Sequence, residues 1–487
     1  MDDDAFSRGN DLAAAGRCDE AVAAFTLCLE RSPDDWQAMC NRGNAWMQLK
    51  RYDRAMDDYM AAAALAPDAT SVKTNLGVLL KELGQLDLAA KMLTESLQHD
   101  PSQADAWSNL GVVRQYGLRY GEAVDCHLRA IDIAGASVAR LNNLGNALCC
   151  ALRLDEAVAA YRTGLELEPA DDNLRFNLSI ALFLQGDYHA AWPMYESRWG
   201  AVLKSRYSGR RWLGEPLGGR RLLLWSEQGL GDSLQMVRFL AALRLREPQA
   251  VIRLACPRTF WRLFSTLPVQ CVEEEQADEA FDLHLPLMSL PGLLDVGIEQ
   301  VPQAPYLHAP DEVAASMAAA LPARRDGRPR VGLVWESGAW GVGIADHGRQ
   351  NKSISPDIFS ALLDVEGIDF VSLQLGELPP SLRGRLAAPA IGDFADTAAI
   401  VEQLDLVISV DTSVVHLAGA LGCPVWVMMR AESAPFFLAR GEDSPWYPSM
   451  RILRQSQAGE WRELLDSACR RLLEWRTTWQ GGAVVLR

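Results

Sequence analysis

The 487-residue sequence predicts an α-solenoid followed by an α/β part that contains two doubly wound, Rossmann-like domains. The solenoid is predicted because small residues, alanines and prolines recur every 34 residues in the first part of the chain. The α/β part is predicted because short apolar runs alternate with amphipathic stretches in the remainder. We expect the solenoid over residues 1–200, one α/β domain over 201–325 and a second over 326–487.

About six helical repeats account for the first 200 residues. The small residues are Gly9, Gly43, Gly77, Gly111, Gly145 and Ser179, and the alanines are Ala21, Ala55, Ala89, Ala123, Ala157 and Ala191. Helix-ending prolines recur at the same interval as Pro33, Pro67, Pro101 and Pro169, with Gly135 in place of one of them. This period and these positions are the signature of tetratricopeptide repeats, in which antiparallel helix pairs stack into a superhelix. We expect the small residues where helices cross closely, and we expect the stacked surface to hold another polypeptide.

The sixth repeat is atypical, because its second helix is predicted to carry Trp192, Tyr195 and Trp199 at helical spacing. A terminal repeat must cover the open end of the solenoid core. The aromatic stripe is therefore expected to pack against the next domain and not to bind a ligand.

The α/β part is expected to begin after an arginine-rich connection at residues 204–211. In the first domain, strands are predicted at 221–225 and 251–255 with a helix at 234–245, and a loop-rich, proline-punctuated segment reaches about residue 310. After a hinge at 326–329, strands are predicted at 331–335, 370–373, 406–410 and 425–429, and a helix at 461–475 closes the chain. Doubly wound sheets bind ligands at the carboxyl ends of their strands, so a site is expected there.

Composition excludes several classes of protein. The net charge of −16, from 47 Lys and Arg against 63 Asp and Glu, argues against a nucleic-acid ligand. Ten cysteines are scattered without a CxxC or other metal-ligand spacing, which is typical of reduced thiols, and no metal is expected. The N-terminus lacks a secretory pattern, and glycines and a proline break the longest uncharged run, 412–429. We expect a cytoplasmic protein without a membrane span.

The first motif with chemical potential runs from Glu227 to Asp232 and reads Glu-Gln-Gly-Leu-Gly-Asp. It directly follows the strand predicted at 221–225. A strand, a glycine-bearing turn and a helix bring backbone N–H groups close to a ligand. In the alternative interpretation, the segment is only a tight turn in which Asp232 is the helix N-cap.

The second motif, Ser409–Gly422, combines the end of a strand, a turn and the start of a helix. The positive N-terminal end of such a helix suits a phosphate. The hydroxyls of Thr412 and Ser413 either cap the helix or add donors to a phosphate. His416 lies near the first turn, where it is either a ligand contact or an ordinary surface or core residue.

The third motif, residues 349–354, places Lys352 on a loop beyond the strand at 331–335. A lysine near a phosphate-binding helix can neutralise a leaving diphosphate. An exposed lysine on a loop is otherwise simply solvated.

Together, the motifs resemble those of bacterial tetratricopeptide-repeat glycosyltransferases whose catalytic half is similar to the lipopolysaccharide heptosyltransferases. The resemblance covers nearly the whole chain and is most specific at 192–199, 222–232, 393–422 and 444–448. It implies the two-domain glycosyltransferase-B fold, a nucleotide sugar as co-substrate, no further cofactor and no metal. The layout is also similar to that of the protein O-GlcNAc transferases and of flagellin glycosyltransferases.

Carried onto this chain, the resemblance implies that Asp232 is the general base and that Lys352 is a cation beside the donor phosphate. The other donor-side residues are expected to be Gln374, Asp411, Thr412, Ser413 and His416, and the loop near the ligand to comprise Gln228, Gly229 and Gly231. A single displacement with Asp232 as base would invert the anomeric configuration. Residues 336–348 and 434–440 depart from the family pattern, so the sugar and the nucleotide are not identified.

A row of asparagines suggests how an acceptor could bind. Asn41, Asn75, Asn109, Asn143 and Asn177 recur every 34 residues, two positions before the small residue. This position is expected on the first helix of each repeat, toward the concave surface, where an amide can bind peptide backbone of any sequence. The arrangement resembles the asparagine ladder of the protein O-GlcNAc transferases. In the alternative, each asparagine bonds to neighbouring groups within the solenoid.

Three functions follow from these patterns. The first is a protein O-glycosyltransferase that modifies Ser or Thr of a protein held by the repeats, with flagellin as the candidate acceptor. The second is a transferase for lipid-linked saccharides, against which the acidic N-terminus and the lack of an anchor count. The third is a repeat scaffold with an inactive transferase half, against which the presence of Asp232, Lys352, Asp411 and His416 counts.

Overall fold

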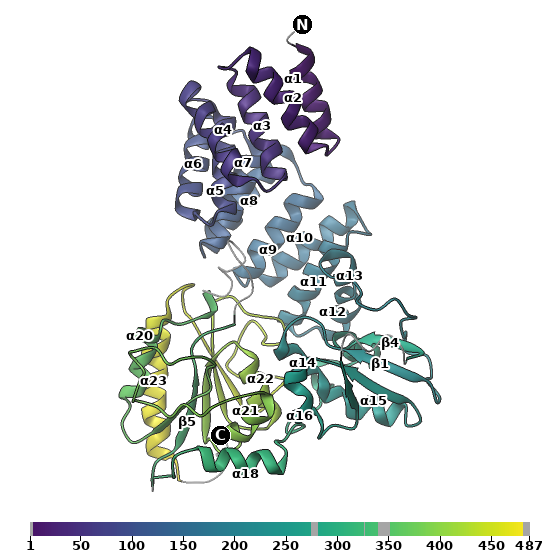
Figure 1. Cartoon of the computed structure of the whole chain (residues 1–487), viewed down its shortest axis with the longest axis vertical. Coiled ribbons are helices and arrows are strands. Elements are labelled where there is room, and N and C mark those ends of the chain that lie inside the picture. Colours follow the sequence, from purple (N-terminus) through teal and green to yellow (C-terminus); the bar gives the residue numbers. More distant parts are fainter. Residues whose placement is uncertain (1–2, 274–280, 326, 339–350, 481–487) are drawn as a thin grey trace. The chain divides into compact units, whose positions relative to one another are not determined.

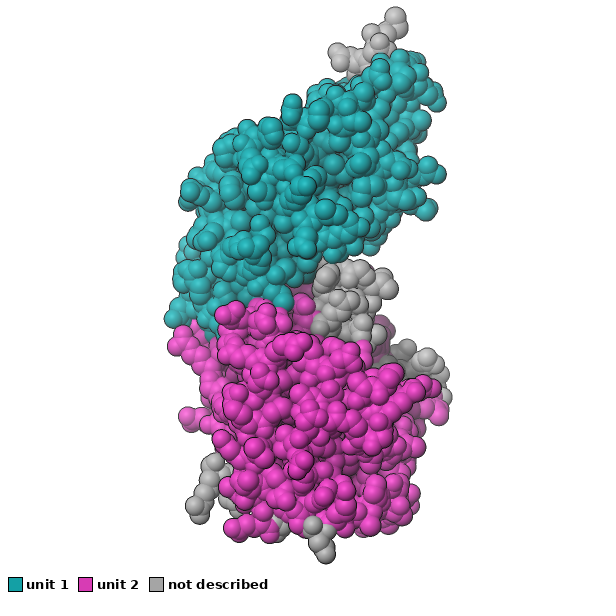
Figure 2. All heavy atoms as spheres, turned by 90° about the vertical axis from the view of Figure 1, so that its left-hand side faces the viewer, with its two compact units in different colours: residues 1–169, 340–348 teal, residues 170–339, 349–487 magenta. Residues whose placement is uncertain are grey.

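The computed structural model describes residues 3–273, 281–325, 327–338 and 351–480 (Figure 1). The described residues form two compact units, coloured separately in Figure 2. Unit 1 contains the described residues up to Pro169, and unit 2 contains those from Ala170 onward. The last predicted repeat thus groups with the α/β part, while the predicted domain boundaries at 200 and 325 stay predictions.

Unit 1 consists of helices that pair along the chain (Figure 1). They are α1 (Asp3–Ala14), α2 (Cys18–Arg31), α3 (Trp36–Gln48), α4 (Tyr52–Leu65), α5 (Thr70–Glu82), α6 (Leu86–His99), α7 (Ala104–Tyr116), α8 (Tyr120–Ala134), α9 (Val138–Cys150) and α10 (Leu154–Leu167). Pro33, Pro67, Pro101 and Pro169 each follow the end of a second helix, and Gly135, with φ +76°, caps α8. The predicted period of helix pairs is confirmed.

The repeated glycines lie where the two helices of a repeat cross. A Cβ atom on any of them would lie between 2.4 and 2.6 Å from a side chain on the second helix. The glycine and side-chain pairs are Gly9 with Phe25, Gly43 with Tyr59, Gly77 with Leu93, Gly111 with His127, and Gly145 with Tyr161. The six repeated alanines are fully buried. Bulkier residues at these positions would separate the helices, which explains the sequence period.

Unit 2 opens with the helices of the sixth repeat, followed by two sheets. The helices are α11 (Asp172–Gln185), α12 (Tyr188–Tyr195) and α13 (Arg198–Ala201). The strands are β1 (Arg221–Trp225), β2 (Val251–Ala255), β3 (Gln270–Val272), β4 (Leu283–Pro286), β5 (Arg330–Val334), β6 (Asp369–Ser372), β7 (Leu406–Val410), β8 (Val425–Met429) and β9 (Met450–Arg454). The α-helices among and after them are α14 (Leu230–Met236), α15 (Leu240–Arg246), α16 (Trp261–Phe264), α17 (Leu290–Leu293), α18 (Asp311–Ala320), α20 (Pro356–Phe359), α21 (Phe394–Val401), α22 (Ser413–Ala420) and α23 (Trp461–Thr478). Short 3₁₀ turns are η1 (Val237–Phe239), η2 (Arg258–Phe260), η4 (Leu287–Ser289), η5 (Ile298–Gln300) and η6 (Ser360–Asp364).

Both sheets are parallel, as predicted, with strand orders β3-β2-β1-β4 and β6-β5-β7-β8-β9. The six strands that the sequence predicted are present, each within one residue of the expected bounds. The loop-rich prediction up to residue 310 was wrong in part, because β3 and β4 lie there, and β9 was not predicted. β3 and β4 are only three and four residues long, and β4 ends in a proline, so neither shows a strand pattern.

The helix predicted at 234–245 begins earlier, as α14 at Leu230, and is interrupted by the 3₁₀ turn at Val237–Phe239. The predicted hinge at 326–329 includes Asp326, which lies outside the described residues. In the part of the chain that the structure describes, no helix is long and apolar enough to cross a bilayer. The parallel sheets are established, and the assignment to the glycosyltransferase-B fold stays a prediction.

The aromatic side chains of the sixth repeat pack against the rest of unit 2, as predicted. Phe183 and Trp192 have ring centroids 4.8 and 5.8 Å from that of Phe436, which lies in the segment after β8. Trp192 also donates a 2.8 Å hydrogen bond to the carbonyl of Val296, and Trp446 donates a 2.5 Å bond to the Tyr188 hydroxyl. We call Phe183, Tyr188, Trp192, Tyr195, Phe436 and Trp446 the aromatic cluster.

The prediction that one helix carries Trp192, Tyr195 and Trp199 was wrong, because α12 ends at Tyr195 and Trp199 lies on α13. The Arg198 guanidinium donates to the carbonyl of Tyr195, which would accept the Trp199 amide in a continuous helix. The Trp199 amide instead donates to the carbonyl of Glu196. Trp199 still packs on the first sheet, 5.4 Å from the ring of Trp225.

One buried histidine makes the stability of unit 1 depend on pH. His127 is 1% exposed, and burial lowers its pKa to about 4. The corresponding position of the preceding repeat holds Leu93, so a leucine fits this place in the repeat. An unfolded histidine has a pKa of about 6.5, so the stabilisation from a neutral His127 is complete above that pH and is lost as the pH falls toward 4.

The free energy of unfolding should therefore fall between pH 7.5 and pH 5 in the wild type. In His127→Leu we expect this fall to be smaller by on the order of 2 kcal/mol, because leucine takes up no proton.

The measurement is urea unfolding followed by helical circular dichroism at both pH values. An equal loss in the wild type and in His127→Leu would contradict a neutral, buried His127.

Candidate functional site

The first candidate motif forms a strained turn after β1. Gln228 has φ +60°, a left-handed conformation that is costly for a residue with a side chain, and α14 begins two residues later. The Asp232 carboxylate accepts a 2.8 Å hydrogen bond from the Gly229 amide, so it closes the turn from within the helix. Gly229 and not Asp232 occupies the N-cap position, but Asp232 caps the turn from the third helical residue, so the tight-turn alternative stays open. Burial raises the pKa of Asp232 to about 6.

The second motif lies at the end of β7, next to β5, where the strand order of the second sheet reverses direction. Such a switch point is where doubly wound sheets leave a crevice for ligands. Thr412 is the N-cap of α22, and its hydroxyl accepts a 3.3 Å hydrogen bond from the Val414 amide. Ser413 is the first residue of the helix. The Thr412 hydroxyl is also 3.1 Å from the Ser409 hydroxyl, so in this structure it caps the helix, and donation to a phosphate stays a prediction.

Lys352 forms an ion pair with Asp411, the first residue after β7, with Nζ 2.7 Å from Oδ2. Their side chains are 23% and 12% exposed, so the pair is largely shielded from water. Burial opposes ionisation of Asp411, but the charge and the hydrogen bond of Lys352 lower its pKa overall. Lys352 is thus not simply solvated. Arg349 and Gln350 of the same motif lie outside the described residues.

The two motifs meet where α14 contacts α22. A Cβ atom on Gly231 would lie 2.7 Å from His416 Cδ2 and 3.5 Å from the Cα of Ser413. Asp411 raises the pKa of Asp232 and Lys352 lowers it, so both charges act on this carboxyl. The structure therefore brings Asp232, Lys352, Asp411 and His416 together at the ends of two different sheets.

His416 is held by an aromatic loop that the sequence resemblance had indicated at 444–448. Its Nδ1 lies 3.3 Å from the hydroxyl of Tyr447, and burial lowers the pKa of His416 to about 4, so the imidazole is neutral at pH 7. Arg238 supports this loop: it donates to the Trp446 carbonyl at 2.8 Å and lies 4.5 Å from the Tyr447 ring centroid. Sequence reasoning missed Arg238, because an arginine within an apolar segment carries no motif of its own.

Gln374 lies two residues after the end of β6. Its Oε1 accepts hydrogen bonds from the amides of Trp335 and Glu336, at 3.3 and 3.1 Å. Gln374 therefore joins the carboxyl ends of β5 and β6, and its expected contact with a nucleotide stays a prediction.

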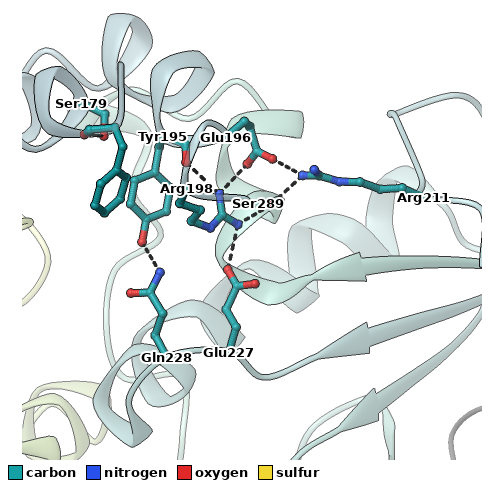
Figure 3. Close-up of polar contacts among 9 residues, drawn as sticks. Ser179, Tyr195, Glu196, Arg198, Arg211, Glu227, Gln228 and Ser289 are labelled. Carbon is teal, nitrogen blue, oxygen red and sulfur yellow. Dashed lines mark hydrogen bonds and ion pairs between the residues drawn. The ribbon is translucent and has the colours of Figure 1, made fainter. Parts of the chain in front are cut away.

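Glu227 and Gln228 are both bonded to the last repeat (Figure 3). The Glu227 carboxylate accepts a 2.8 Å bond from Arg198, and Gln228 donates a 2.6 Å bond to the Tyr195 hydroxyl. Burial raises the pKa of Glu227 to about 7, although Arg198 opposes this. The sequence drew attention to the Glu227–Asp232 turn and to residues 192–199, but it did not single out Arg198.

The predicted asparagine row lies on the first helices α3, α5, α7, α9 and α11, and all five asparagines are half-buried. Asn41 donates a 2.8 Å bond to Asn10, and Asn75 donates a 3.3 Å bond to the Cys40 sulfur. Both contacts reach the preceding repeat. The structure thus assigns a packing contact to two of the amides, and peptide binding by the row stays a prediction.

Among residues 3–273, 281–325, 327–338 and 351–480, no group of three or more His, Cys, Asp or Glu side chains is placed to hold a metal ion. All ten cysteines lie within these ranges, and none of them forms a disulfide bond.

Comparisons with known proteins bear on the repeats directly. Residues 6–70 and 143–197 match the family model described as "Tetratricopeptide repeat". The N-terminal part of this chain is a tetratricopeptide-repeat solenoid. No further family assignment follows, because these segments are a minor part of the chain.

Two relatives and one solved structure illustrate the likeness. Protein FlbA of Caulobacter vibrioides is 24% identical over 476 residues, which cover 83% of this chain and 78% of FlbA. Human Protein O-mannosyl-transferase TMTC1 is 24% identical over 158 residues, or 32% of this chain and 18% of TMTC1. The crystal structure of TTC0263, a tetratricopeptide-repeat protein of Thermus thermophilus, has a TM-score of 0.34 at 23% identity and covers 37% of this chain and 99% of TTC0263.

The Lys352–Asp411 ion pair gives a test of the site before any ligand is known. We expect Lys352→Met to lower the free energy of unfolding by roughly 1–3 kcal/mol, because it leaves the Asp411 carboxylate buried without a counter-charge. The matched control is Arg210→Met in the exposed Arg210–Glu215 pair, with an expected loss within about 0.5 kcal/mol.

Thermal unfolding of the full chain measures both variants. Adding Asp411→Asn to Lys352→Met should recover part of the loss. Equal effects of Lys352→Met and Arg210→Met would show that the pair is solvated and would remove it from the site.

Proposed function

We propose that this chain is an inverting, metal-independent glycosyltransferase of the glycosyltransferase-B type. It would transfer a sugar from a nucleotide-sugar donor to a Ser or Thr hydroxyl of a protein that the repeats hold. One observation carries the proposal. The turns after β1 and β7, which belong to separate parallel sheets, meet through Gly231 and His416, so Asp232 lies in the same environment as Lys352 and Asp411.

Asp232 is suited to the role of general base. A base works best when its pKa lies near the working pH, and burial raises the pKa of Asp232 to about 6. The carboxylate is held in place by the Gly229 amide, which donates to Oδ2. A positioned base of this kind contributes about 10²- to 10⁴-fold to a rate.

The carboxyl ends of β5 and β7 offer groups that could stabilise the negative charge of the leaving nucleotide. The N-terminal end of α22 presents backbone N–H groups there, and Lys352 supplies a positive charge. In the reaction, the acceptor oxygen forms a bond to the anomeric carbon while the bond from that carbon to the phosphate oxygen breaks. The hydroxyl proton passes to Asp232, the nucleotide leaves with the electron pair, and the anomeric configuration inverts.

The repeats suggest a protein acceptor, because tetratricopeptide repeats generally mediate protein interactions. The FlbA match covers 83% of the chain and so extends well beyond the repeats into the α/β part. The name of TMTC1 describes a protein O-mannosyl-transferase, which joins such repeats to O-glycosylation in another protein. Flagellin, modified in the cytoplasm before export, is the acceptor that we propose to try first.

The direct test of catalysis is Asp232→Asn. A panel of nucleotide sugars is first screened by thermal shift of the full chain, and the donor that stabilises it is used to measure nucleotide release. We expect Asp232→Asn to lower the rate by at least about 10²-fold while the donor-induced shift persists. The wild-type rate should rise as the pH passes through about 6, because the ionised carboxylate is the active form.

Unchanged nucleotide release by Asp232→Asn would remove Asp232 from the catalytic role, and a wild type that releases no nucleotide from any donor would favour the inactive-scaffold alternative. Retention of the anomeric configuration in the first-formed product, seen by NMR, would remove Asp232 from the role of base.

A second experiment tests the asparagine row. We expect the combined replacement of Asn75, Asn109 and Asn143 by Ala to lower kcat/KM for a protein acceptor by about tenfold, because each amide offers hydrogen bonds to a peptide backbone. Donor hydrolysis without acceptor should stay unchanged. Gln98→Ala, which removes an exposed amide from the second helix α6, is the matched control. A parallel loss of hydrolysis and transfer would mean that the row is structural.

A further inference from the structure

The first sheet also has a switch point, and Arg198 of the last repeat bonds to residues that follow both of its strands. In the order β3-β2-β1-β4, the strand order reverses between β1 and β4, where a doubly wound sheet leaves a ligand crevice. The fully buried Arg198 of α13 donates to Glu227 Oε1 at 2.8 Å and to the Ser289 hydroxyl at 2.6 Å. Glu227 follows β1 and Ser289 follows β4, so one guanidinium joins the ends of both strands (Figure 3).

The same guanidinium is anchored in the last repeat. Its Nη1 donates to the Tyr195 carbonyl at 3.1 Å and to Glu196 Oε1 at 2.9 Å. Tyr195 in turn accepts the 2.6 Å hydrogen bond from Gln228, the residue with φ +60°. Two consecutive residues of the strained turn are therefore bonded to the last repeat, four and five residues before the candidate base Asp232.

Arg198 is also the counter-charge of Glu227. The Glu227 side chain is 3% exposed, and its Oε2 has no hydrogen-bond partner among the described residues. Without Arg198 the Glu227 carboxyl would either stay as a buried, uncompensated charge or take up a proton and lose its bonded cation, so the turn depends on Arg198 in both cases. A strained backbone conformation persists only where the surroundings determine it, and here Arg198 and Tyr195 supply that constraint.

We propose that Arg198 is a positioning residue for glycosyl transfer: it holds the Glu227–Gln228 turn so that Asp232 faces the donor crevice. This rests on the proposed function, with Asp232 as the base. The last repeat would then be a working part of the reaction centre in addition to the end of the solenoid. Arg211 provides a natural comparison, because it bonds to the same Glu196 and Ser289, whereas the hydrogen bond to Glu227 comes from Arg198.

The experiment compares Arg198→Met with Arg211→Met in the full chain, using nucleotide release from the donor identified in the thermal-shift panel. We expect Arg198→Met to lower kcat by about 10- to 100-fold, since small displacements of a reacting group have effects of this size. KM for the donor should stay within about twofold, because the residues around α22 are untouched. Arg211→Met should retain nearly the wild-type kcat.

A second variant separates positioning from stability. Arg198→Met combined with Glu227→Gln removes the uncompensated buried charge, so the unfolding temperature should recover while kcat stays low. Recovery of kcat together with the unfolding temperature would overturn the proposal, since Arg198 would then act only through stability. An equal loss of kcat in Arg211→Met would overturn it as well. Should Arg198→Met not fold, this double variant carries the comparison.

Hydrogen exchange of the ligand-free protein gives a readout that does not depend on activity. Amides of residues 226–232 should exchange at least about tenfold faster in the double variant than in the wild type, while those of α22 should be unchanged. Unchanged exchange at 226–232 would overturn the proposal. If exchange rises as expected but no nucleotide sugar is turned over, the proposed function fails and the control of the turn by Arg198 stands.

Discussion

The candidate site depends on the close approach of α14 and α22, which is possible only because residue 231 is glycine. A Cβ atom at this position would lie 2.7 Å from the ring of His416, well inside van der Waals contact. The contact joins two helices that each begin just after the end of a central strand, β1 in one sheet and β7 in the other. The relation between Asp232 and the Lys352–Asp411 pair follows from this approach, because it brings the turns of the two sheets together.

The surroundings of Asp411 and Asp232 shift the pKa values of these two carboxyl groups in opposite directions. Asp411 has a lowered pKa because Lys352 pairs with it, whereas Asp232 bonds to a neutral backbone amide and its pKa is raised by burial. The neutral His416 lies between the two helices and adds no charge at pH 7. Asp411 therefore stays ionised at lower pH than Asp232, because only Asp411 has a paired cation.

The last repeat belongs structurally to the α/β unit. The aromatic cluster buries Phe183, Tyr188 and Trp192 against Phe436 and Trp446, and the Trp192 indole bonds to the segment before β5. A solenoid must cover its terminal apolar surface, and this chain covers it with a folded domain where other solenoids use a polar capping helix. Through Arg198 and Tyr195, the repeat that covers the end of the solenoid also forms hydrogen bonds to the Glu227–Asp232 turn.

Local patterns determined most of the fold. Each repeated glycine and alanine was predictable because its place depends on one close helix crossing that recurs with the repeat, and the six predicted strands were short, mostly apolar runs. β4 escaped prediction because a short strand ending in Pro286 is stabilised by its neighbour β1 and not by its own pattern. Arg198 and Arg238 could not be found in the sequence for a similar reason. Their partners lie 29 and 208 residues away, as with Glu227 and the Trp446 carbonyl, so only the folded chain decides that these arginines are buried and what they hold. The sequence by itself determined the repeats, the strands and the turns that carry the candidate residues. Tertiary packing decided which of those turns meet, because contact between distant segments depends on the summed shape of all the side chains between them.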